Sequence, residues 1–190
     1  MYKVVSYYQE DPMAIANFHR DARVLLSEYN YYLRNLMLSI LNGTSETTEI
    51  VNRLDKTQTS IGKLLTPFYP METGLSFAEL LKTHVTIVTD YITAMRAKQD
   101  LTPIQTRWVT NTDEIATLLN SVDPIRWPKG TIVTCLTQHA NYIHRQIMAR
   151  MENDWAADIE AEDLTYHNLI DLADVISTGI VMSNLEKFSK

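Results

Sequence analysis

The feature that most constrains this chain is a series of long segments in which apolar residues recur three and four positions apart. In the segment from about 12 to 41 these residues are Val24, Leu25, Tyr29, Tyr32, Leu36 and Ile40. The same period continues over about 76–98, 103–121, 131–154 and 155–185. It places the apolar residues on one face of an α-helix, and no strand-like alternation competes with it. The sequence therefore predicts an all-α protein.

Glycine, asparagine and proline mark the ends of these helices. The marker groups are Asn42-Gly43, Pro67, Thr102-Pro103, Asp123-Pro124 and Pro128-Lys129-Gly130. Glycine and asparagine tolerate the left-handed conformation that follows a helix, and proline fits only its first turn. Between the first two groups we expect a short helix over about 47–65. Near Asn153 the last two helices are either continuous or kinked.

Long helices joined by short connections pack as antiparallel neighbours. The fold class that follows is an all-α, up-and-down antiparallel helical bundle of four to five long helices plus one short helix, ferritin-like in outline. With 190 residues, the chain is expected to form a single domain over 1–190. Residues 1–11 are expected to be a less regular amino-terminal segment.

Charge and composition exclude several classes of function. The net charge of −6, without a basic cluster, argues against a direct nucleic-acid partner. No apolar run approaches the ~18 residues of a membrane span, and the amino terminus lacks a signal-peptide pattern. We expect a soluble intracellular protein of the cytoplasm, or a virion component if the chain is viral. The acidic run at 158–163 is expected to lie mostly on a solvated helix face.

Six polar residues fall on or beside the apolar stripes: His84, Asn111, Glu114, His139, Asp163 and His167. We predict that they form an interior polar network. A buried imidazole needs a partner, because leaving it unpaired costs on the order of 1–3 kcal/mol. Asp163 and His167 are four positions apart, which permits a carboxylate–imidazole contact. His139 and His144 diverge around their helix and are not expected to chelate one ion together.

A metal site is the alternative to a structural network. A divalent transition metal such as zinc or nickel would find ligands of suitable type in His84, Glu114, His139, Asp163 and His167. A di-iron bundle site requires Glu-x-x-His motifs, and none occurs in this sequence. If the six polar residues form only a structural network, no cofactor is expected. A pocket for a small ligand is the third alternative.

The sequence contains no complete catalytic arrangement. Cys135, the single cysteine, lies among apolar residues one turn before His139, where a thiol lacks the electropositive setting that activates it. No serine sits in a nucleophile elbow, and no glycine-rich phosphate loop occurs. The sequence leaves enzymatic activity open and favours a non-enzymatic role, with no catalytic residue predicted.

A set of different short motifs is spread over most of the chain, from about 26 to 188. They are Arg53-Leu54, Ile61-Gly62, Phe68-Tyr69, the run 80–84, the run W-x-x-N-x-D-E-I-A at 108–116, Asp123-Pro124, His139, Asp158-Ile159, Asp163, His167 and Ser177-x-Gly179-Ile180. Together they resemble a small all-helical family of uncharacterised proteins of bacteria and large DNA viruses. The family tends to show a histidine, an aromatic residue and a Thr-Arg pair in the first helix, where this chain has Tyr29, Tyr32, Leu33 and Arg34. The resemblance implies the helical fold, one fewer potential metal ligand, and no established activity.

Two classes of function remain open. The first is a non-enzymatic helical bundle that acts through protein–protein contacts, as a homo-oligomer or as a component of a virion or other particle. Candidates for its contact surface are Tyr7, Tyr8, Tyr31, Met37, Met148, Met151 and Met182. The second is a metal- or small-ligand-binding bundle, including a metalloenzyme, that uses the interior His, Asp and Glu side chains.

Overall fold

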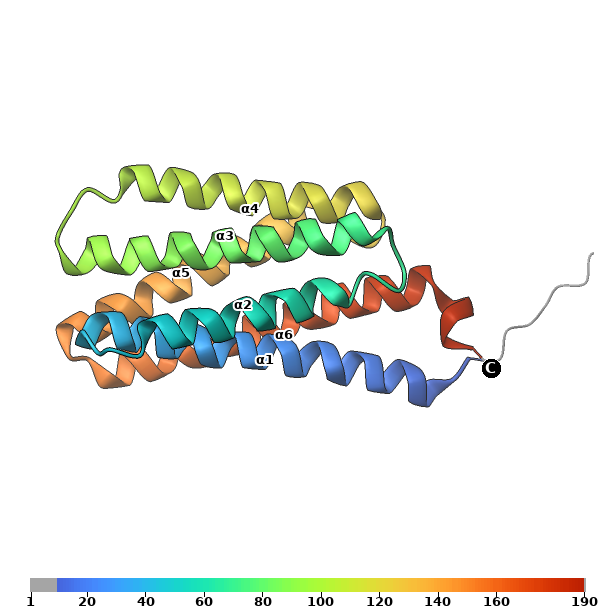
Figure 1. The fold of residues 1–190 in the computed structure, drawn as a ribbon, viewed down its shortest axis with the longest axis horizontal. Coiled ribbons are helices and arrows are strands. Elements are labelled where there is room, and N and C mark those ends of the chain that lie inside the picture. The colour runs from blue at the N-terminus through green and yellow to red at the C-terminus, as the bar shows by residue number, and fades with distance from the viewer. Residues whose placement is uncertain (1–9, 190) are drawn as a thin grey trace, which may run out of the picture.

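The computed structural model describes residues 10–189, which form six α-helices and one short 3₁₀ helix. The elements are α1 (Pro12–Asn42), α2 (Thr47–Lys63), α3 (Met71–Arg96), α4 (Thr102–Val122), α5 (Lys129–Glu152), α6 (Trp155–Ser183) and η1 (Leu185–Phe188). Five of the α-helices have 21 to 31 residues, and α2 has 17. The prediction of an all-α bundle with one shorter helix is confirmed (Figure 1).

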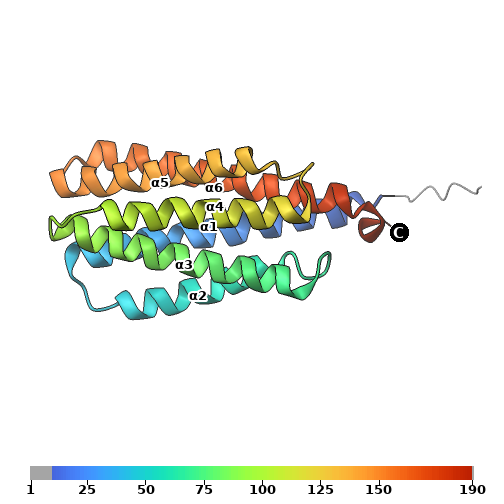
Figure 2. The same cartoon turned by 90° about the horizontal axis from the view of Figure 1, so that it is seen from above.

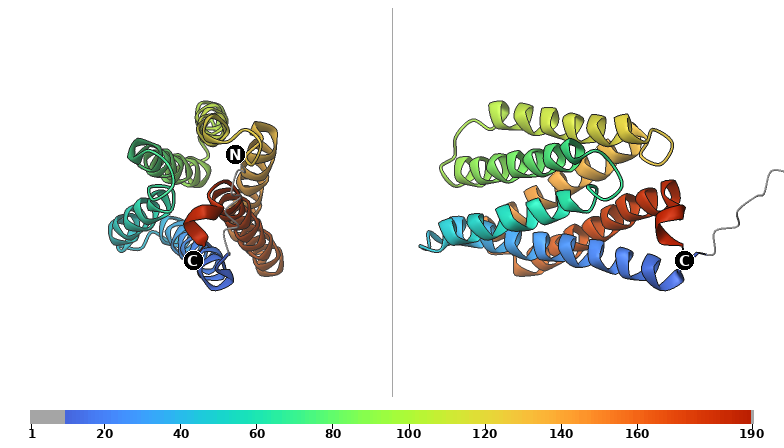
Figure 3. Two further views of the ribbon diagram at one scale, coloured as in Figure 1. Left: turned by 90° about the vertical axis from the view of Figure 1, so that its right-hand side faces the viewer. Right: turned by 45° about the vertical axis from the view of Figure 1, so that its right-hand side comes forward.

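Each helix runs antiparallel to the one before it and packs against it. The last helix, α6, also packs along α1 and closes the series, while α3 makes a further contact with α1. Seen from one end, the helices follow one another around the bundle (Figure 3). Seen from above, α2 and α5 lie on opposite sides of it (Figure 2). The apolar stripes of the six helices meet in one hydrophobic core.

The helix ends follow local chemistry. Asp11 caps α1 by accepting hydrogen bonds from the backbone N–H groups of Met13 and Ala14. Gly43, at φ 69°, ends α1 as predicted. Asn153, at φ 60°, separates α5 from α6, so these are two distinct helices. The less regular segment expected at 1–11 lies mostly outside the described residues.

Two helices begin earlier than predicted. The turn expected at Pro128-Lys129-Gly130 is instead the start of α5, with Pro128 directly before its first residue. The start of α3 is Met71, five residues ahead of the expected position 76. This extra turn contains Gly74, whose weak helix propensity is outweighed by a helix contact that only glycine permits.

That contact is a close approach of α2 and α3 at Gly62 and Gly74. A Cβ atom placed on Gly74 would lie 2.5 Å from the Gly62 carbonyl oxygen, and one placed on Gly62 would overlap the Gly74 carbonyl oxygen. Both obstacles are backbone atoms, so they cannot rotate away as a side chain would. The two glycines therefore fix the distance between α2 and α3.

The connection between α4 and α5 is anchored by Trp127, which is fully buried. Its indole N–H donates to the backbone carbonyl of Val175 on α6 at 3.1 Å. The ring lies against Gly179, where any Cβ atom would overlap it. This loop is thereby attached to α6 as well as to the two helices that it joins.

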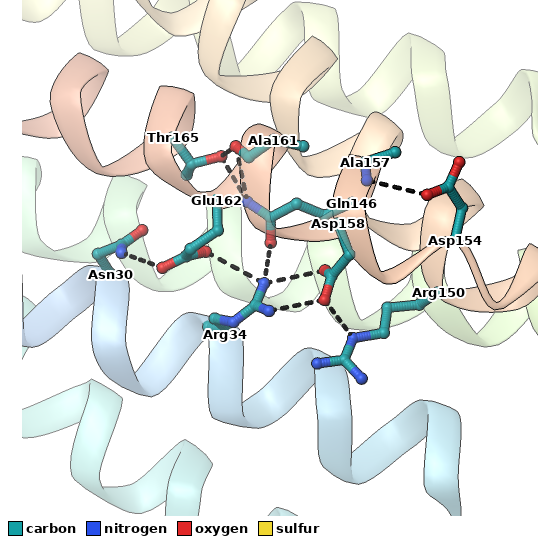
Figure 4. Close-up of polar contacts among 10 residues, drawn as sticks. All are labelled: Asn30, Arg34, Gln146, Arg150, Asp154, Ala157, Asp158, Ala161, Glu162 and Thr165. Atoms are coloured by element: carbon teal, nitrogen blue, oxygen red, sulfur yellow. Dashed lines mark hydrogen bonds and ion pairs between the residues drawn. The ribbon is translucent and has the colours of Figure 1, made fainter.

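A buried ion network joins α1, α5 and α6 around Asp158, whose side chain is only 2% exposed. Both carboxylate oxygens of Asp158 accept hydrogen bonds from Arg34 of α1, at 2.8 and 3.1 Å. Arg150 of α5 places its Nε 2.7 Å from Oδ2 of the same carboxylate (Figure 4). Asp158 therefore does not lie on the solvated face that its acidic run predicted, because two guanidinium groups replace the water around it.

The network continues one turn along α6 at Glu162. Arg34 lies 3.3 Å from one oxygen of Glu162, and the Asn30 amide donates to the other at 2.8 Å (Figure 4). Burial raises the pKa of Glu162, and the charge of Arg34 opposes that shift. The Arg34 guanidinium also donates to the side-chain oxygen of Gln146 on α5 at 3.2 Å. One arginine of α1 thus contacts both α5 and α6.

We expect Gly62→Ala to lower the free energy of unfolding by about 2–3 kcal/mol, because α2 and α3 must separate to admit the methyl group. Gly130→Ala is the matched control, since a Cβ there has no atom within 4 Å. This control should be neutral or slightly stabilising, as alanine favours helices more than glycine does. Urea denaturation at neutral pH measures both, and equal effects would contradict the close approach.

We expect Asp158→Asn to lower the free energy of unfolding by about 3 kcal/mol, because it leaves Arg150 without a counter-charge and Arg34 with Glu162 alone. Asp163→Asn is the control on the same helix, where the side chain is exposed. It should change stability by no more than about 0.5 kcal/mol. Thermal and urea unfolding of the two variants distinguish them, and a harmless Asp158→Asn would show that the network contributes little.

Candidate functional site

The core contains two histidines that face each other from different helices. His84 of α3 and His139 of α5 have ring centroids 5.5 Å apart and ring planes inclined by 32°. They are 4% and 1% exposed. His84 also meets the Trp108 ring of α4 edge-on at 5.5 Å. We call His84 and His139 the buried histidine pair.

Several polar atoms around the buried histidine pair lack a hydrogen-bond partner among the described residues. They are Nε2 of His84, both ring nitrogens of His139, Oδ1 of Asn111 and Nε1 of Trp108. The Asn111 amide nitrogen, in contrast, donates to the Leu80 carbonyl at 3.0 Å. Leaving such a group unpaired costs on the order of 1–3 kcal/mol. The ring packing around the pair opposes this cost.

Burial keeps both imidazoles neutral. It lowers the pKa of His84 to about 4, with a smaller opposing effect from the Asn111 side chain, even though Asn111 Oδ1 falls outside hydrogen-bond geometry. Burial, and then repulsion from His84, lower the pKa of His139 to about 3. At pH 7 each ring therefore offers one N–H donor and one nitrogen acceptor.

Three of the six residues predicted to form an interior network lie in the core. His84, Asn111 and His139 are buried, but no hydrogen bond joins them to one another. Glu114, Asp163 and His167 are exposed, so their assignment to the interior was wrong. Glu114 lies about 60° around α4 from the stripe that contains Asn111. For the two residues on α6 the reason is different, because apolar residues lie on both the inner and the outer side of that helix, so its sequence period does not define a single inner face.

The predicted metal ligands are not gathered in one place. Of the five, only His84 and His139 are neighbours. Within residues 10–189, no group of three or more His, Cys, Asp or Glu side chains is placed to hold a metal ion. The unpaired amide oxygen of Asn111 belongs to a side chain close to His84. A bound transition metal stays a prediction.

A groove of about 330 Å³ lies between α4 and α5, next to the buried histidine pair. We call it the α4–α5 groove; its lining includes Tyr91, Gln105, Trp108, Thr137, Asn141 and His144. The Tyr91 hydroxyl lies 2.9 Å from Nδ1 of His144. Trp108 joins the two sites, because its ring contacts both His84 and Tyr91. His144 is exposed while His139 is buried, as their predicted divergence requires.

A larger and more open groove of about 1080 Å³ runs along α1 and α6. Arg23 of α1 donates two hydrogen bonds to Asp174 of α6, at 2.6 and 2.7 Å. Nδ1 of His19 lies 2.7 Å from the Ser177 hydroxyl. His167 lines this surface groove beside Tyr166 instead of entering the core. The helical period of α1 and α6 did not predict this groove, because exposed apolar residues interrupt the amphipathic pattern of both helices.

Cys135 is half-buried on α5, with its sulfur 3.5 Å from the side-chain nitrogen of Asn168. Burial raises the pKa of the Cys135 thiol, and the Asn168 contact opposes the shift. A thiol with a raised pKa is less often the thiolate that reacts as a nucleophile. This setting agrees with the structural role predicted from its apolar neighbours.

Comparison with family models, curated proteins and solved structures finds no match for this chain. The family resemblance based on the run 108–116 therefore stays a prediction. Among residues 10–189, no helix combines the length and apolar character needed to cross a membrane. The described residues form an α-helical bundle with a buried histidine pair and several surface grooves, which include the α4–α5 groove and the groove along α1 and α6.

Both imidazoles of the pair have a pKa below the value of about 6.5 found in unfolded chains. At pH values between the folded and the unfolded pKa of these histidines, the unfolded chain binds more protons than the folded protein. Above about pH 6.5 both histidines are neutral in the folded and the unfolded chain, so they do not reduce the free energy of unfolding. As the pH falls toward 3–4, proton binding by the unfolded chain lowers the free energy of unfolding.

We expect the free energy of unfolding to decrease between about pH 6.5 and pH 5, above the range in which most carboxylates titrate. The double substitution His84→Leu, His139→Leu should reduce this decrease, because it removes both buried bases. His167→Leu, at an exposed position, should keep the wild-type slope. Urea titrations at a series of pH values measure the slopes, and identical slopes in all three proteins would refute the linkage.

Proposed function

We propose that this protein has a non-enzymatic role and acts through protein–protein contacts made by the exposed side of α1 and α6, with a second copy of the chain as the partner. We call this surface the α1–α6 face. The observation that carries the proposal is a pair of exposed apolar stripes, one on each helix, on either side of the groove between them.

The stripe on α6 consists of Trp155, Ile159, Tyr166 and Ile170. Their spacing places them within about 60° around the helix. The first three are exposed, and the fourth is half-buried. The core side of α6 is apolar as well, and acidic and polar residues separate it from the outer stripe. An apolar stripe on the exposed side of a helix favours a further packing partner.

The stripe on α1 consists of Met13, Val24 and Tyr31, which lie within about 20° of one another around the helix. Their side chains are exposed by 68%, 51% and 61%. Neighbouring α1 and α6 run side by side along one edge of the bundle (Figures 1 and 3). The two stripes therefore belong to one surface, and clustered exposed aromatic and apolar residues are typical of interaction sites.

Charge on this face is compatible with a second copy as the partner. Arg20 and Arg23 of α1 pair within the chain with Asp21 and Asp174, so neither guanidinium group presents an uncompensated charge to a second copy. A two-fold axis that lays α1 of one copy on α6 of the other allows these ion pairs to be exchanged between the copies. Self-complementarity of this kind is what a symmetric dimer interface requires.

The candidate contact residues named from the sequence divide into two groups. Tyr31, Met148, Met151 and Met182 are exposed, which keeps them available for contacts. Met37 is buried in the core and cannot contribute. Tyr7 and Tyr8 lie outside the described residues. Tyr31 is the member of the set that belongs to the α1–α6 face.

We expect the wild-type protein to sediment at twice the chain mass of 21.8 kDa at concentrations of tens of micromolar. The double substitution Ile159→Asp, Tyr166→Asp should shift it to the mass of one chain, because two carboxylates would be buried in the interface. Ile125→Asp is the control, since Ile125 is 81% exposed in the α4–α5 connection. It should leave the dimer intact. A wild-type protein that is monomeric over this range would refute self-association.

A further inference from the structure

We infer that the α4–α5 groove binds a small, uncharged, planar heteroaromatic molecule, which stacks on the aromatic side chains of the groove and hydrogen-bonds to its amides. The groove shares no residue with the α1–α6 face, so this inference stands independently of the proposed dimer. Four properties of the groove support it: its size, its aromatic walls, its charge and its polar edge.

The size of the groove suits a ligand of one or two fused rings. Its volume of about 330 Å³ lies at the lower end of the range for small-molecule sites, which begins near 300 Å³. The walls come from two adjacent helices, α4 and α5, with Tyr91 reaching in from α3. A slot between rigid helices holds its shape without a ligand, which reduces the entropy cost of binding.

Three ring systems line the groove: Tyr91, Trp108 and His144. Trp108 and Tyr91 are buried in the bundle and meet edge-on, with ring centroids 5.2 Å apart. His144 is held by its 2.9 Å contact with the Tyr91 hydroxyl. The rings are thus fixed before any ligand arrives. Trp108 and Tyr91 are 6% and 3% exposed, so a flat ligand contacts the parts of these rings that border the groove and stacks there.

The charge of the lining excludes strongly ionic ligands. Asp113 is the one Asp, Glu, Lys or Arg among the described residues that line the groove. Its carboxylate already pairs with Lys129 at 2.7 Å. No unpaired cation is available for a phosphate or carboxylate group, and no unpaired anion for an ammonium group. An uncharged ligand fits this balance.

The polar edge of the groove can recognise a ring with both donors and acceptors. Gln105 and Asn141 each offer an amide N–H₂ and an amide oxygen. Gln105 lies close enough to the Tyr91 hydroxyl to oppose the rise in the Tyr91 pKa that burial causes. Together with His144, these groups give the groove alternating donors and acceptors. Such an edge complements the ring nitrogens and carbonyl groups of a heteroaromatic molecule.

Three probes of similar shape test the class of ligand: 4-quinazolinone, which is neutral and has a polar edge; naphthalene, which has no polar edge; and 2-naphthoate, which is charged. Saturation-transfer NMR and quenching of tryptophan fluorescence give their dissociation constants with the full-length protein. We expect 4-quinazolinone to bind with a dissociation constant of about 1 mM or below. Naphthalene and 2-naphthoate should bind at least about tenfold more weakly.

Two substitutions on α5 locate the binding. Thr137→Phe places a ring inside the groove and should weaken 4-quinazolinone at least about tenfold. Thr134→Phe adds the same ring one turn earlier on α5, at an exposed position outside the groove lining, and should leave binding within about twofold. Both positions are on the surface, so neither change disturbs the core.

A third variant, Asn141→Leu, removes one polar group from the edge and should weaken 4-quinazolinone at least about threefold. The inference is overturned if 4-quinazolinone fails to bind, or if all three probes bind equally. It is also overturned if Thr137→Phe and Thr134→Phe have the same effect, because binding would then lie elsewhere. A circular dichroism spectrum of each variant confirms that the helices are intact.

Discussion

Asp158 carries its negative charge inside the bundle, and the position of three helices depends on how that charge is balanced. An unpaired carboxylate in the core would cost several kcal/mol. Arg34 and Arg150 approach it from α1 and α5, at 2.8 and 2.7 Å. Both guanidinium groups must reach the same carboxylate, so α1, α5 and α6 can pack in only one register. This register sets where α1 and α6 run side by side, and with it the groove and the exposed stripes of the α1–α6 face.

The core contains two clusters of polar groups that differ in how many of their polar atoms have partners. Around Asp158 both carboxylate oxygens have charged partners and the network spans three helices, although Nε of Arg150, 2.7 Å from Oδ2, forms an ion pair without hydrogen-bond geometry. Around the buried histidine pair, five polar atoms of four residues lack a partner among the described residues. Satisfied networks stabilise one arrangement of a core, whereas unsatisfied groups are tolerated where surrounding contacts compensate. The edge-on rings of Trp108 and Tyr91 provide such contacts, and they also form the inner wall of the α4–α5 groove.

The helical period, with its glycine and proline stops, predicted the fold class and most helix boundaries, because both signals depend on residues close in sequence. Gly43 ends α1 through its own backbone conformation, so it could be recognised without knowing the fold. Gly74 could not, because its role depends on Gly62 in another helix. The same distinction explains the candidate site. His84 and His139 lie on clear stripes, but nothing in the acidic run of α6 reveals that Asp158 meets two arginines while Asp163, five residues later, meets solvent.

The closed order of the helices has a consequence for how the chain folds. Most helix pairs in the ring are neighbours in sequence, so they can form as successive hairpins with little loop-closure entropy. The pairing of α1 with α6 is different, because it joins segments separated by almost the whole described chain. During synthesis, α1 leaves the ribosome before α6, and its inner face is not fully covered until α6 has followed. Until then Arg34 has no Asp158 to bind, and the uncovered face is the part of the nascent chain most exposed to misassociation with another molecule.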